Sequence, residues 1–499
     1  MHKISKGLAI LAAALLCSCA GGPGGSKPAY DADVIVVGSG LAGHGAVYGA
    51  LEGGARVLLL EKNDRLGGTS LTSTGTFSAA GTRIQKEKGI EDSVQAHIDD
   101  INRIGHGKAD QALLRKFAEE AAGVWEWFVD KGINPNPAGP VIDPVHSPYS
   151  VARTMTPAKN SANEYVRVLA EQAKAKYGER LAALVSTKVT ALVSEKGRVV
   201  GVKAAGPEGE RIYRAKAVVL ATGGYGSNRA MIQKYSPRYA EYRTVTPPWA
   251  TGEGIEMAAA AGAELVNMDY VVGYFGGMPK AADHYALGFG DLTSGFADRW
   301  KGEIWVGSDG KRFVNEDDGD EDPRETAIDK LEGGKILIVF DQGILDKNGG
   351  KTPIRDFDAR LAQGYAVKKA DTAEELAKAF GVDAKGLKAT IDGVSAASAQ
   401  GQADYFGKTT GLPFEKGPYY GVLCYGTIFM TQGGVRVDGS LRALGKDGKP
   451  VAGLYAAGEA MGTSQWGGRG YAGGTGVAPA IVFGLDAGKS AAAFAKAGK

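Results

Sequence analysis

The stretch DVIVVGSGLAG, from Asp33 to Gly43, decides the fold of this chain. A β-branched apolar run enters a glycine-rich turn, and a helix of small residues is expected to follow. A second apolar run, Ala55–Leu60, ends at Glu61. Strand, glycine turn, helix and strand in this order form the unit that binds a dinucleotide, and an acidic residue about 20 positions after the turn accepts hydrogen bonds from a ribose.

Each glycine of the turn has its own physical task. Gly38 allows the tight turn, Gly40 lets the backbone approach a pyrophosphate, and Gly43 lets helix and strand pack closely. The N–H groups of Leu41 and Ala42, at the start of the helix, are expected to face the phosphates. This unit binds either NAD or FAD, so the glycine pattern alone does not choose between them.

Composition excludes several classes of protein. The 499 residues are 44% hydrophobic and 23% charged, which is ordinary for a globular chain of two or three domains. The formal net charge of +2 does not indicate a nucleic-acid partner. No Cys-x-x-Cys pair is present, so we expect no thiol redox pair, attached haem or metal site. The acidic run Glu316–Asp322 lacks EF-hand spacing and is predicted to be a solvated surface loop.

The N-terminus has the pattern of a targeting segment. Lys3 and Lys6 precede a short apolar stretch, Gly7–Leu16, and the sequence LCSC ends at Cys19. This resembles a bacterial lipoprotein signal. We therefore expect residues 1–19 to be a lipoprotein signal peptide with Cys19 lipidated, followed by a flexible linker at 20–30. The mature protein would be exported and anchored to a membrane, facing the periplasm; an ordinary secretory signal is the alternative.

Periodicity indicates the other elements. Apolar spacing predicts helices over 91–131, 162–177, 372–380, 385–399 and 477–497. Asp371 or Thr372, with Glu375, is expected to cap the third of these. Alternating and β-branched runs predict strands at 188–193, 199–204 and 217–220.

Seven motifs in order resemble the FAD-dependent oxidoreductase 2 family, which includes fumarate reductase flavoproteins, flavocytochrome c and 3-ketosteroid dehydrogenases. They are VVGSGLAG with the following Glu-Lys, GGTS at 67–70, ATGG at 221–224, KRFVNE at 311–316, DYFG at 404–407, GG at 433–434 and GLYAAGE at 453–459. The resemblance implies an α/β fold: a Rossmann-type (GR2-like) FAD-binding domain in two sequence-distant pieces, at 31–271 and 429–499, with an inserted α+β capping domain at 272–428.

The resemblance also implies FAD as the cofactor. Membrane-complex fumarate reductases attach the flavin to a histidine after a serine; here Leu71 follows Ser70, so we expect noncovalent FAD. The positive end of the helix that begins at Val477 is expected to face the flavin pyrimidine oxygens. Beyond the glycine turn and Glu61, the cofactor contacts implied by the motifs are Lys62, Gly67, Gly68, Thr69, Ser70, Val189, Thr222, Gly223, Gly224, Glu459, Gly474, Thr475, Gly476 and Val477.

The substrate site departs from the family pattern. Soluble fumarate reductases grip the substrate with two histidines, whereas this chain has Met430 at one position and the sequence Gly273–Phe275 at the other. Tyr274 of that sequence is a candidate catalytic residue. With Phe275, Trp249 and Trp466 it forms either an aromatic pocket or part of the core.

Three further residues complete the candidate catalytic set. Arg324, displaced by the acidic run, matches the family's proton-donating arginine, although a surface arginine beside that run is the alternative. The proton donor would be Arg324 or a tyrosine. Arg469 matches a carboxylate-binding arginine. Tyr471 matches the tyrosine that contacts the substrate carbonyl in ketosteroid dehydrogenases, with a packing role as its alternative.

These assignments predict an exported FAD-dependent oxidoreductase acting on CH–CH groups. It would reduce, or form, a C=C bond adjacent to a carbonyl or carboxylate of a small unsaturated acid or ketone, by hydride transfer at flavin N5, but not on fumarate. Without a haem or FMN attachment motif, electrons would come from an external carrier, a c-type cytochrome or a quinol-linked protein. A 3-ketosteroid-type dehydrogenase and a flavin-binding electron-transfer protein without its own substrate are the alternatives.

Overall fold

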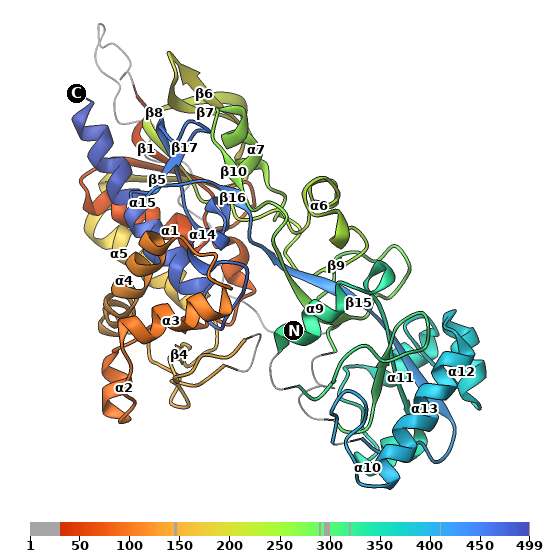
Figure 1. The fold of residues 1–499 in the computed structure, drawn as a ribbon. Helices are drawn as coiled ribbons and strands as arrows, with labels where there is room; N and C mark the ends of the chain where they lie inside the picture. The colour runs from red at the N-terminus through yellow and green to blue at the C-terminus, as the bar shows by residue number, and fades with distance from the viewer. Residues whose placement is uncertain are drawn as a thin grey trace, which may run out of the picture. The chain divides into compact units, whose positions relative to one another are not determined.

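The computed structural model describes residues 30–143, 147–288, 291–293, 300–318, 321–409 and 411–498. They form two compact units (Figure 1). The first unit runs through Tyr225 and adds Trp249–Tyr270 and Thr431–Lys499; the second contains Gly226–Pro248 and Val271–Met430. The mixed α/β architecture confirms the predicted fold class. The expected signal peptide, Cys19 and residues 20–29 of the expected linker lie outside the described residues.

Residues 226–248 pack with the second unit, although the expected boundaries place them in the FAD-binding part. The reason is local pairing: β9 (Arg243–Thr244) forms a parallel ladder with β15 (Tyr419–Thr431). The Tyr242 hydroxyl also donates to Asp329 Oδ1 at 2.9 Å. Helix α6 (Arg229–Tyr235) and the turn η3 (Pro237–Tyr239) complete this segment. Short elements of this kind leave no periodic signal in the sequence.

The first unit is built on a parallel sheet. In spatial order its strands are β18 (Pro450–Ala456), β8 (Gly209–Leu220), β1 (Ala32–Val37), β2 (Val57–Leu60) and β5 (Leu181–Leu184), each parallel to the next. The apolar runs of β1 and β2 are buried throughout, apart from one half-buried aspartate in β1. Continuous apolar burial is what a parallel sheet covered on both faces requires.

An antiparallel meander extends this sheet. Strands β6 (Lys188–Glu195) and β7 (Arg198–Gly206) pair antiparallel, and β7 pairs with β8. Strand β8 is longer than the predicted 217–220 because its exposed first half pairs with β7 as part of the meander. Strand β17 (Arg442–Leu444) borders β18, and β10 (Leu265–Val266) pairs with β16 (Gly434–Val435).

Helices α1 (Leu41–Glu52) and α15 (Val477–Ala497) pack backbone to backbone. A Cβ on Gly49 would overlap the Leu485 carbonyl, and one on Gly488 would overlap the Ala46 carbonyl. Among the described residues, α15 is the one helix long and apolar enough to cross a membrane by length and composition. Here it lies against α1 within the core of the first unit.

The remaining elements of the first unit surround the sheet. The predicted helix 91–131 is two helices, α3 (Val94–Ile104) and α4 (Gln111–Asp130). Helix α5 (Asn163–Tyr177) matches its prediction closely. The others are η1 (Gly68–Leu71), β3 (Phe77–Ser78), α2 (Arg83–Glu87), β4 (Thr154–Met155), η2 (Gly178–Arg180), α7 (Glu253–Ala260), η6 (Gly458–Met461) and α14 (Ser464–Gly467).

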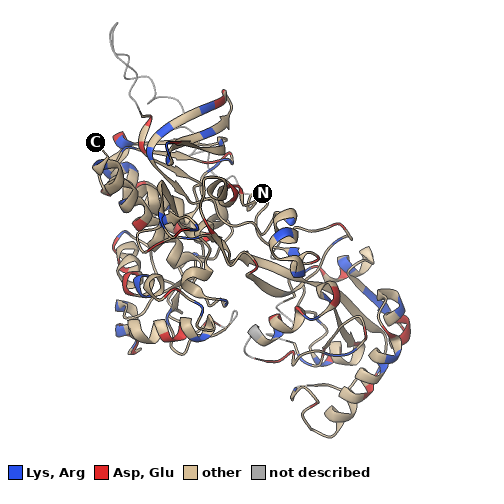
Figure 2. Cartoon of the chain, turned by 45° about the horizontal axis from the view of Figure 1, so that its top comes forward, with Lys and Arg blue, Asp and Glu red and all other residues tan. Residues whose placement is uncertain are grey.

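The second unit has its own sheet, in the order β11 (Val271–Gly277), β15, β13 (Lys335–Asp341) and β12 (Ile304–Val306), with β14 (Val367–Ala370) also on β15. Its helices are α9 (Glu321–Ile328), α10 (Gln342–Lys347), α11 (Phe357–Gln363), α12 (Ala373–Phe380) and α13 (Ala384–Ala399), with the turn η5 (Glu332–Gly334). The predicted capping box of α12 is present, formed by Thr372 and Glu375. Acidic and basic residues are interspersed along both units (Figure 2).

The sequence predicted a solvated surface loop for the acidic run, but the first residue of the run is buried. Glu316 is buried and accepts hydrogen bonds from Arg312 Nε at 2.8 Å and the Trp305 N–H at 2.9 Å. The guanidinium neutralises the carboxylate and satisfies it, so its burial is tolerated.

Glu303, next to β12, is buried, and its burial makes the stability of the fold depend on pH. Neither of its carboxylate oxygens has a hydrogen-bond partner among the described residues. Burial raises the pKa of Glu303 from 4.5 to about 7. Because the folded state holds this proton more tightly than the unfolded state, the free energy of unfolding decreases as pH rises from about 4.5 to about 7.

We expect Glu303→Gln to remove that loss of stability. The variant should match the wild type at pH near 4 and be more stable above pH 8, by up to about 3 kcal/mol. Thermal unfolding of both proteins at the two pH values measures the difference. Glu332→Gln, at an exposed carboxylate of the same unit, is the control. A melting-temperature difference that is the same at both pH values would contradict the prediction.

Candidate functional site

Glu61, at the end of β2, ties the glycine turn to the next loop. It is 5% exposed. One carboxylate oxygen accepts from the N–H and hydroxyl of Ser39, and the other accepts from the Asn63 N–H at 2.8 Å. The Ser39 hydroxyl in turn accepts from the Gly67 N–H at 3.1 Å. Sequence reasoning missed Ser39; its hydroxyl, between two glycines of the motif, was the available signal.

The start of α1 has open space beside it. A Cβ on Gly40 would meet no atom within 4 Å, whereas a Cβ on Gly43 would overlap the carbonyl oxygen of Gly38. The Ser70 hydroxyl accepts from the Leu41 N–H at 3.1 Å. A ligand therefore has room at Gly40, where the helix N-terminus favours an anion.

A second open surface lies at the end of β8. Gly223 has a φ of +77°, and a Cβ there would meet nothing within 4 Å. The Thr222 hydroxyl is buried without a hydrogen-bond partner among the described residues. This hydroxyl faces Gly254 of α7, where an added Cβ would overlap it. Both features lie in the first unit with the glycine turn.

Glu459, in η6, faces this region. A Cβ on Gly224 would lie 2.8 Å from Glu459 Oε1. Burial raises the pKa of Glu459 to about 7, although the N–H groups of Gly224 and Thr431 donate to it and oppose the shift. The Thr431 hydroxyl accepts from the Tyr225 N–H at 3.1 Å. Sequence reasoning missed Thr431, whose position beside the altered histidine segment was the available signal.

The loop before α15 is compact. Gly476 is the N-cap of α15, and Gly474 has a φ of +86°. Thr475 is buried and its hydroxyl donates to the Ala472 carbonyl at 2.7 Å. The Tyr471 hydroxyl lies 3.3 Å from the position of a Cβ on Gly476. Burial, with the Asp143 carboxylate, raises the pKa of Tyr471, so its phenol is neutral and able to donate.

Lys62 forms hydrogen bonds and an ion pair with other residues of the first unit. Its Nζ donates to Thr251 Oγ1 at 2.8 Å and to both carboxylate oxygens of Glu253. Lys188 pairs with the same carboxylate at 3.2 Å. Burial favours a higher pKa for Glu253, but the hydrogen bonds from Thr251 and Lys62 outweigh it and lower the pKa to about 2.

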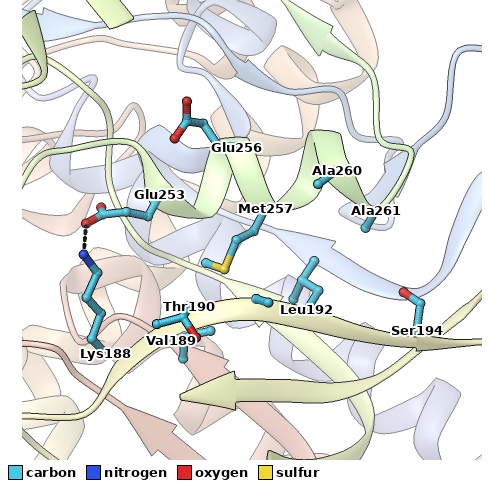
Figure 3. Close-up of a pocket in the computed structure, with 11 residues that line it drawn as sticks. Lys188, Val189, Thr190, Leu192, Ser194, Glu253, Glu256, Met257, Ala260 and Ala261 are labelled. Atoms are coloured by element: carbon cyan, nitrogen blue, oxygen red, sulfur yellow. Dashed lines mark ion pairs between the residues drawn. The ribbon is translucent and has the colours of Figure 1, made fainter. Parts of the chain in front are cut away.

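Val189 lies beside an open groove. The groove has a volume of about 600 Å³ and runs between β6 and α7. Figure 3 shows the Lys188–Glu253 ion pair at one end and Ser194 at the other. Met257 and Leu192 form part of its apolar lining.

The remaining candidates of the first unit differ in setting. Arg469 is exposed, with its guanidinium carbon 5.2 Å from the ring centroid of Tyr270. Trp466 is buried between Phe117 and Phe483, at ring-centroid distances of 5.7 and 6.2 Å. Of the two interpretations of Trp466, a core residue is therefore the one that holds.

Two candidates lie in the second unit. Arg324, in α9, is 3% exposed and donates from Nη1 to the Glu316 carbonyl at 3.0 Å. The alternative of a surface arginine is therefore wrong. Tyr274, in β11, is buried, with its ring centroid 6.3 Å from that of Phe429. Met430 is also buried.

Comparison with known proteins gives a family. The family profile described as "FAD binding domain" matches residues 33–476. The chain is 32% identical over 481 residues to an NADH:fumarate oxidoreductase of Klebsiella pneumoniae, covering 95% of this chain and 48% of the relative. It is also 32% identical to a probable fumarate reductase of Shewanella frigidimarina, covering 93% of this chain and 75% of that protein. The chain thus spans about half of the first relative and three quarters of the second.

One further relative and two solved structures are also similar to this chain. A urocanate reductase of Eggerthella lenta is 32% identical over 93% of this chain and 75% of its own length. The open conformation of a flavocytochrome c3 fumarate reductase has a TM-score of 0.72 and 30% identity, covering 94% of this chain and 79% of that one. A 3-ketosteroid Δ1-dehydrogenase from Sterolibacterium denitrificans has a TM-score of 0.77 at 23% identity, covering 93% and 99%, and so shares the fold.

The first unit fits the cofactor of this family. The space at Gly40, beside the N-terminus of α1, and the space at Gly223 are what a phosphate-linked ligand needs.

We expect Gly40→Val to fold and to lose FAD. The added side chain meets no protein atom at its Cβ, and the backbone φ of −67° suits valine, but it fills the space needed by a pyrophosphate. The variant should show the wild-type circular dichroism and contain little FAD, measured by flavin absorbance per protein and by FAD released on acid precipitation.

Two further variants control this experiment. Gly123→Val, in α4, adds the same side chain to an open position outside the turn and should keep FAD. Gly43→Val should fail to fold, because its Cβ overlaps the backbone of Gly38. A yellow Gly40→Val protein with one FAD per chain would contradict the assignment.

The profile match, the relatives at 32% identity and the shared architecture lead to one conclusion. The chain belongs to the FAD-binding domain family that includes fumarate reductase flavoproteins, and it is an FAD-dependent oxidoreductase.

Proposed function

We propose that this chain reduces, or in the opposite direction forms, a C=C bond adjacent to a carbonyl or carboxylate. Relatives named as fumarate, urocanate and acrylate reductases support the reaction type. The observation that carries the proposal is the burial of Arg324, 3% exposed, which the sequence resemblance matches to the family's proton donor. FAD, when bound, supplies the hydride chemistry.

Arg324 would protonate the substrate α-carbon. An arginine side chain stays protonated up to about pH 12, so it donates only to a strongly basic carbanion, such as the one left after hydride addition to an activated alkene. The hydrogen bond from Nη1 to the Glu316 carbonyl, at 3.0 Å, orients the guanidinium.

Arg469 and Tyr471 would bind the activating group of the substrate. Arg469 offers a charged, forked donor for a carboxylate. Tyr471 offers a neutral hydroxyl, since burial raises its pKa, and this donor suits a carbonyl oxygen.

Fumarate is a poor match for this set. Each carboxylate that enters a buried site needs a charged or strongly donating partner. Met430 supplies neither, and Tyr274 supplies one hydroxyl. We therefore propose a mono-anionic or ketone-activated alkene as the substrate.

We expect acrylate or urocanate to oxidise reduced methyl viologen through this enzyme faster than fumarate does. Arg324→Ala should lower the rate about tenfold to a hundredfold, the effect of losing one charged hydrogen bond, with FAD content unchanged. Arg355→Ala removes an exposed arginine of the same unit and should leave the rate unchanged. Arg469→Ala should mainly raise the apparent KM. Fumarate outperforming every mono-acid and ketone would contradict the proposed selectivity.

Tyr471 favours a second candidate, a 3-ketosteroid-type dehydrogenase. Its neutral phenol lies near the N-cap of α15, where the helix dipole would stabilise a developing enolate oxygen beside it. Turnover of a 3-ketosteroid with an artificial electron acceptor, abolished in Tyr471→Phe, would establish this candidate. If neither alkenes nor steroids reoxidise or reduce the flavin, an electron-transfer protein without its own substrate remains.

We also propose noncovalent FAD and an external electron carrier, a c-type cytochrome or a quinol-linked protein. The sequence contains no Cys-x-x-Cys-His motif. A relative named fumarate reductase (cytochrome), of which this chain spans 79%, supports a cytochrome as the type of carrier.

We propose that the protein is exported and anchored to a membrane through Cys19. Two acyl chains added at the mature N-terminus hold a protein firmly, whereas a single chain binds only marginally. Cys19→Ala should move the protein from the membrane to the soluble periplasmic fraction, measured by fractionation and immunoblot. Cys17→Ala is the matched control and should stay with the membrane; the reverse result would assign the lipid to Cys17.

A further inference from the structure

The second unit contains a buried lysine that the proposed reaction does not use. The Lys408 side chain is 0% exposed. Its Nζ donates to the Glu303 carbonyl at 2.7 Å and lies 3.5 Å from Glu316 Oε2 and 3.6 Å from Asp317 Oδ1. Burying an ammonium group costs several kcal/mol unless carboxylates compensate it. Here they do, because the Glu316 and Glu303 carboxylates oppose the effect of burial and raise the pKa of Lys408.

A second buried ion pair joins the same two loops. Arg312, next to Glu316 on one loop, pairs with Asp404 on the other. The other Asp404 oxygen accepts from the N–H groups of Phe406 and Lys408, at 2.8 and 3.1 Å. Two ion pairs thus join the loops 312–317 and 404–408. The cation of one pair, Arg312, lies on the first loop, and the cation of the other, Lys408, lies on the second. Arg312 and Asp404 are 92 positions apart in the sequence.

The segment held by these two ion pairs contacts the proposed proton donor. The Glu316 carbonyl accepts from Arg324 Nη1, and the Glu316 side chain is held by Arg312 and the Trp305 N–H. Asp317, the next residue, has no hydrogen bond to its carboxylate among the described residues and pairs only through Lys408. The position of the Glu316–Asp317 peptide therefore depends on Lys408 on one side and Arg312 on the other.

We propose that Lys408 is a positioning residue, which fixes the Glu316–Asp317 segment so that the Glu316 carbonyl holds the Arg324 guanidinium in one orientation. The inference rests on the proposed role of Arg324.

The variants separate positioning from folding. Lys408→Met alone leaves the Asp317 carboxylate without its cation, whereas Glu316 keeps Arg312. The main variant is therefore the double substitution Lys408→Met with Asp317→Asn, which removes the charge from both members of that pair. Lys408→Arg keeps the charge and should restore function in part. Glu303→Gln is the matched control: it is equally buried beside Lys408, and its backbone carbonyl, the group that Lys408 contacts, is kept.

The first measurement uses enzyme whose flavin is reduced beforehand and then mixed with acrylate in deoxygenated buffer. In the double variant the rate constant of flavin reoxidation should fall at least about tenfold. Its amplitude and half-saturating acrylate concentration should be unchanged, and its solvent deuterium isotope effect should increase. Loss of folded protein would lower the amplitude instead. An unchanged rate constant and isotope effect would overturn the proposal.

The second measurement does not depend on the reaction. Hydrogen exchange followed by mass spectrometry should show faster exchange in α9, which carries Arg324, and no change in α12 of the same unit. Unchanged exchange in α9 would overturn the proposal even if activity fell. If wild-type enzyme reduces no alkene, the proposed function fails, whereas exchange in α9 still decides whether Lys408 fixes this segment.

Discussion

The first unit depends on one buried carboxylate. Glu61 ends the second strand of the sheet and binds both the N–H and the hydroxyl of Ser39, inside the glycine turn. Ser39 then holds the Gly67 N–H. The turn, the strand end and the loop carrying Ser70 therefore share one hydrogen-bonded centre, and the open space at Gly40 keeps its shape because these three segments cannot move independently. A charged acceptor makes stronger hydrogen bonds than a neutral one, which suits it to this task.

Much of the first unit could be predicted from sequence because its signals are local. The glycine spacing, the apolar strands and the helix over 477–497 each depend on neighbouring residues, and the structure has them at those positions. Ser39 was missed because the motif treats its position as variable. The exposed first half of β8 was missed because it is a strand through pairing with β7 rather than through its own pattern.

The second unit was harder to predict because its contacts are distant in sequence. The sequence presents Glu316 as the first of several acids, whereas in the fold the cations of Arg312 and Lys408 compensate its burial. Arg324 was assigned by resemblance, yet its burial follows from the Glu316 carbonyl and the packing of α9. A charge that is neutralised by a partner about 90 residues away has the same local pattern as a solvated one.

The backbone contact between α1 and α15 has a consequence for how the chain acquires its structure during synthesis. The glycine face of α1 has its partner in the last 21-residue helix of the described chain. A ribosome releases the dinucleotide-binding strands and α1 more than 400 residues before that helix. Until it arrives, small residues that offer little apolar surface of their own have no close-packed neighbour, so the first unit cannot complete its core during elongation. The core of the first unit is thus completed only when α15 packs against α1.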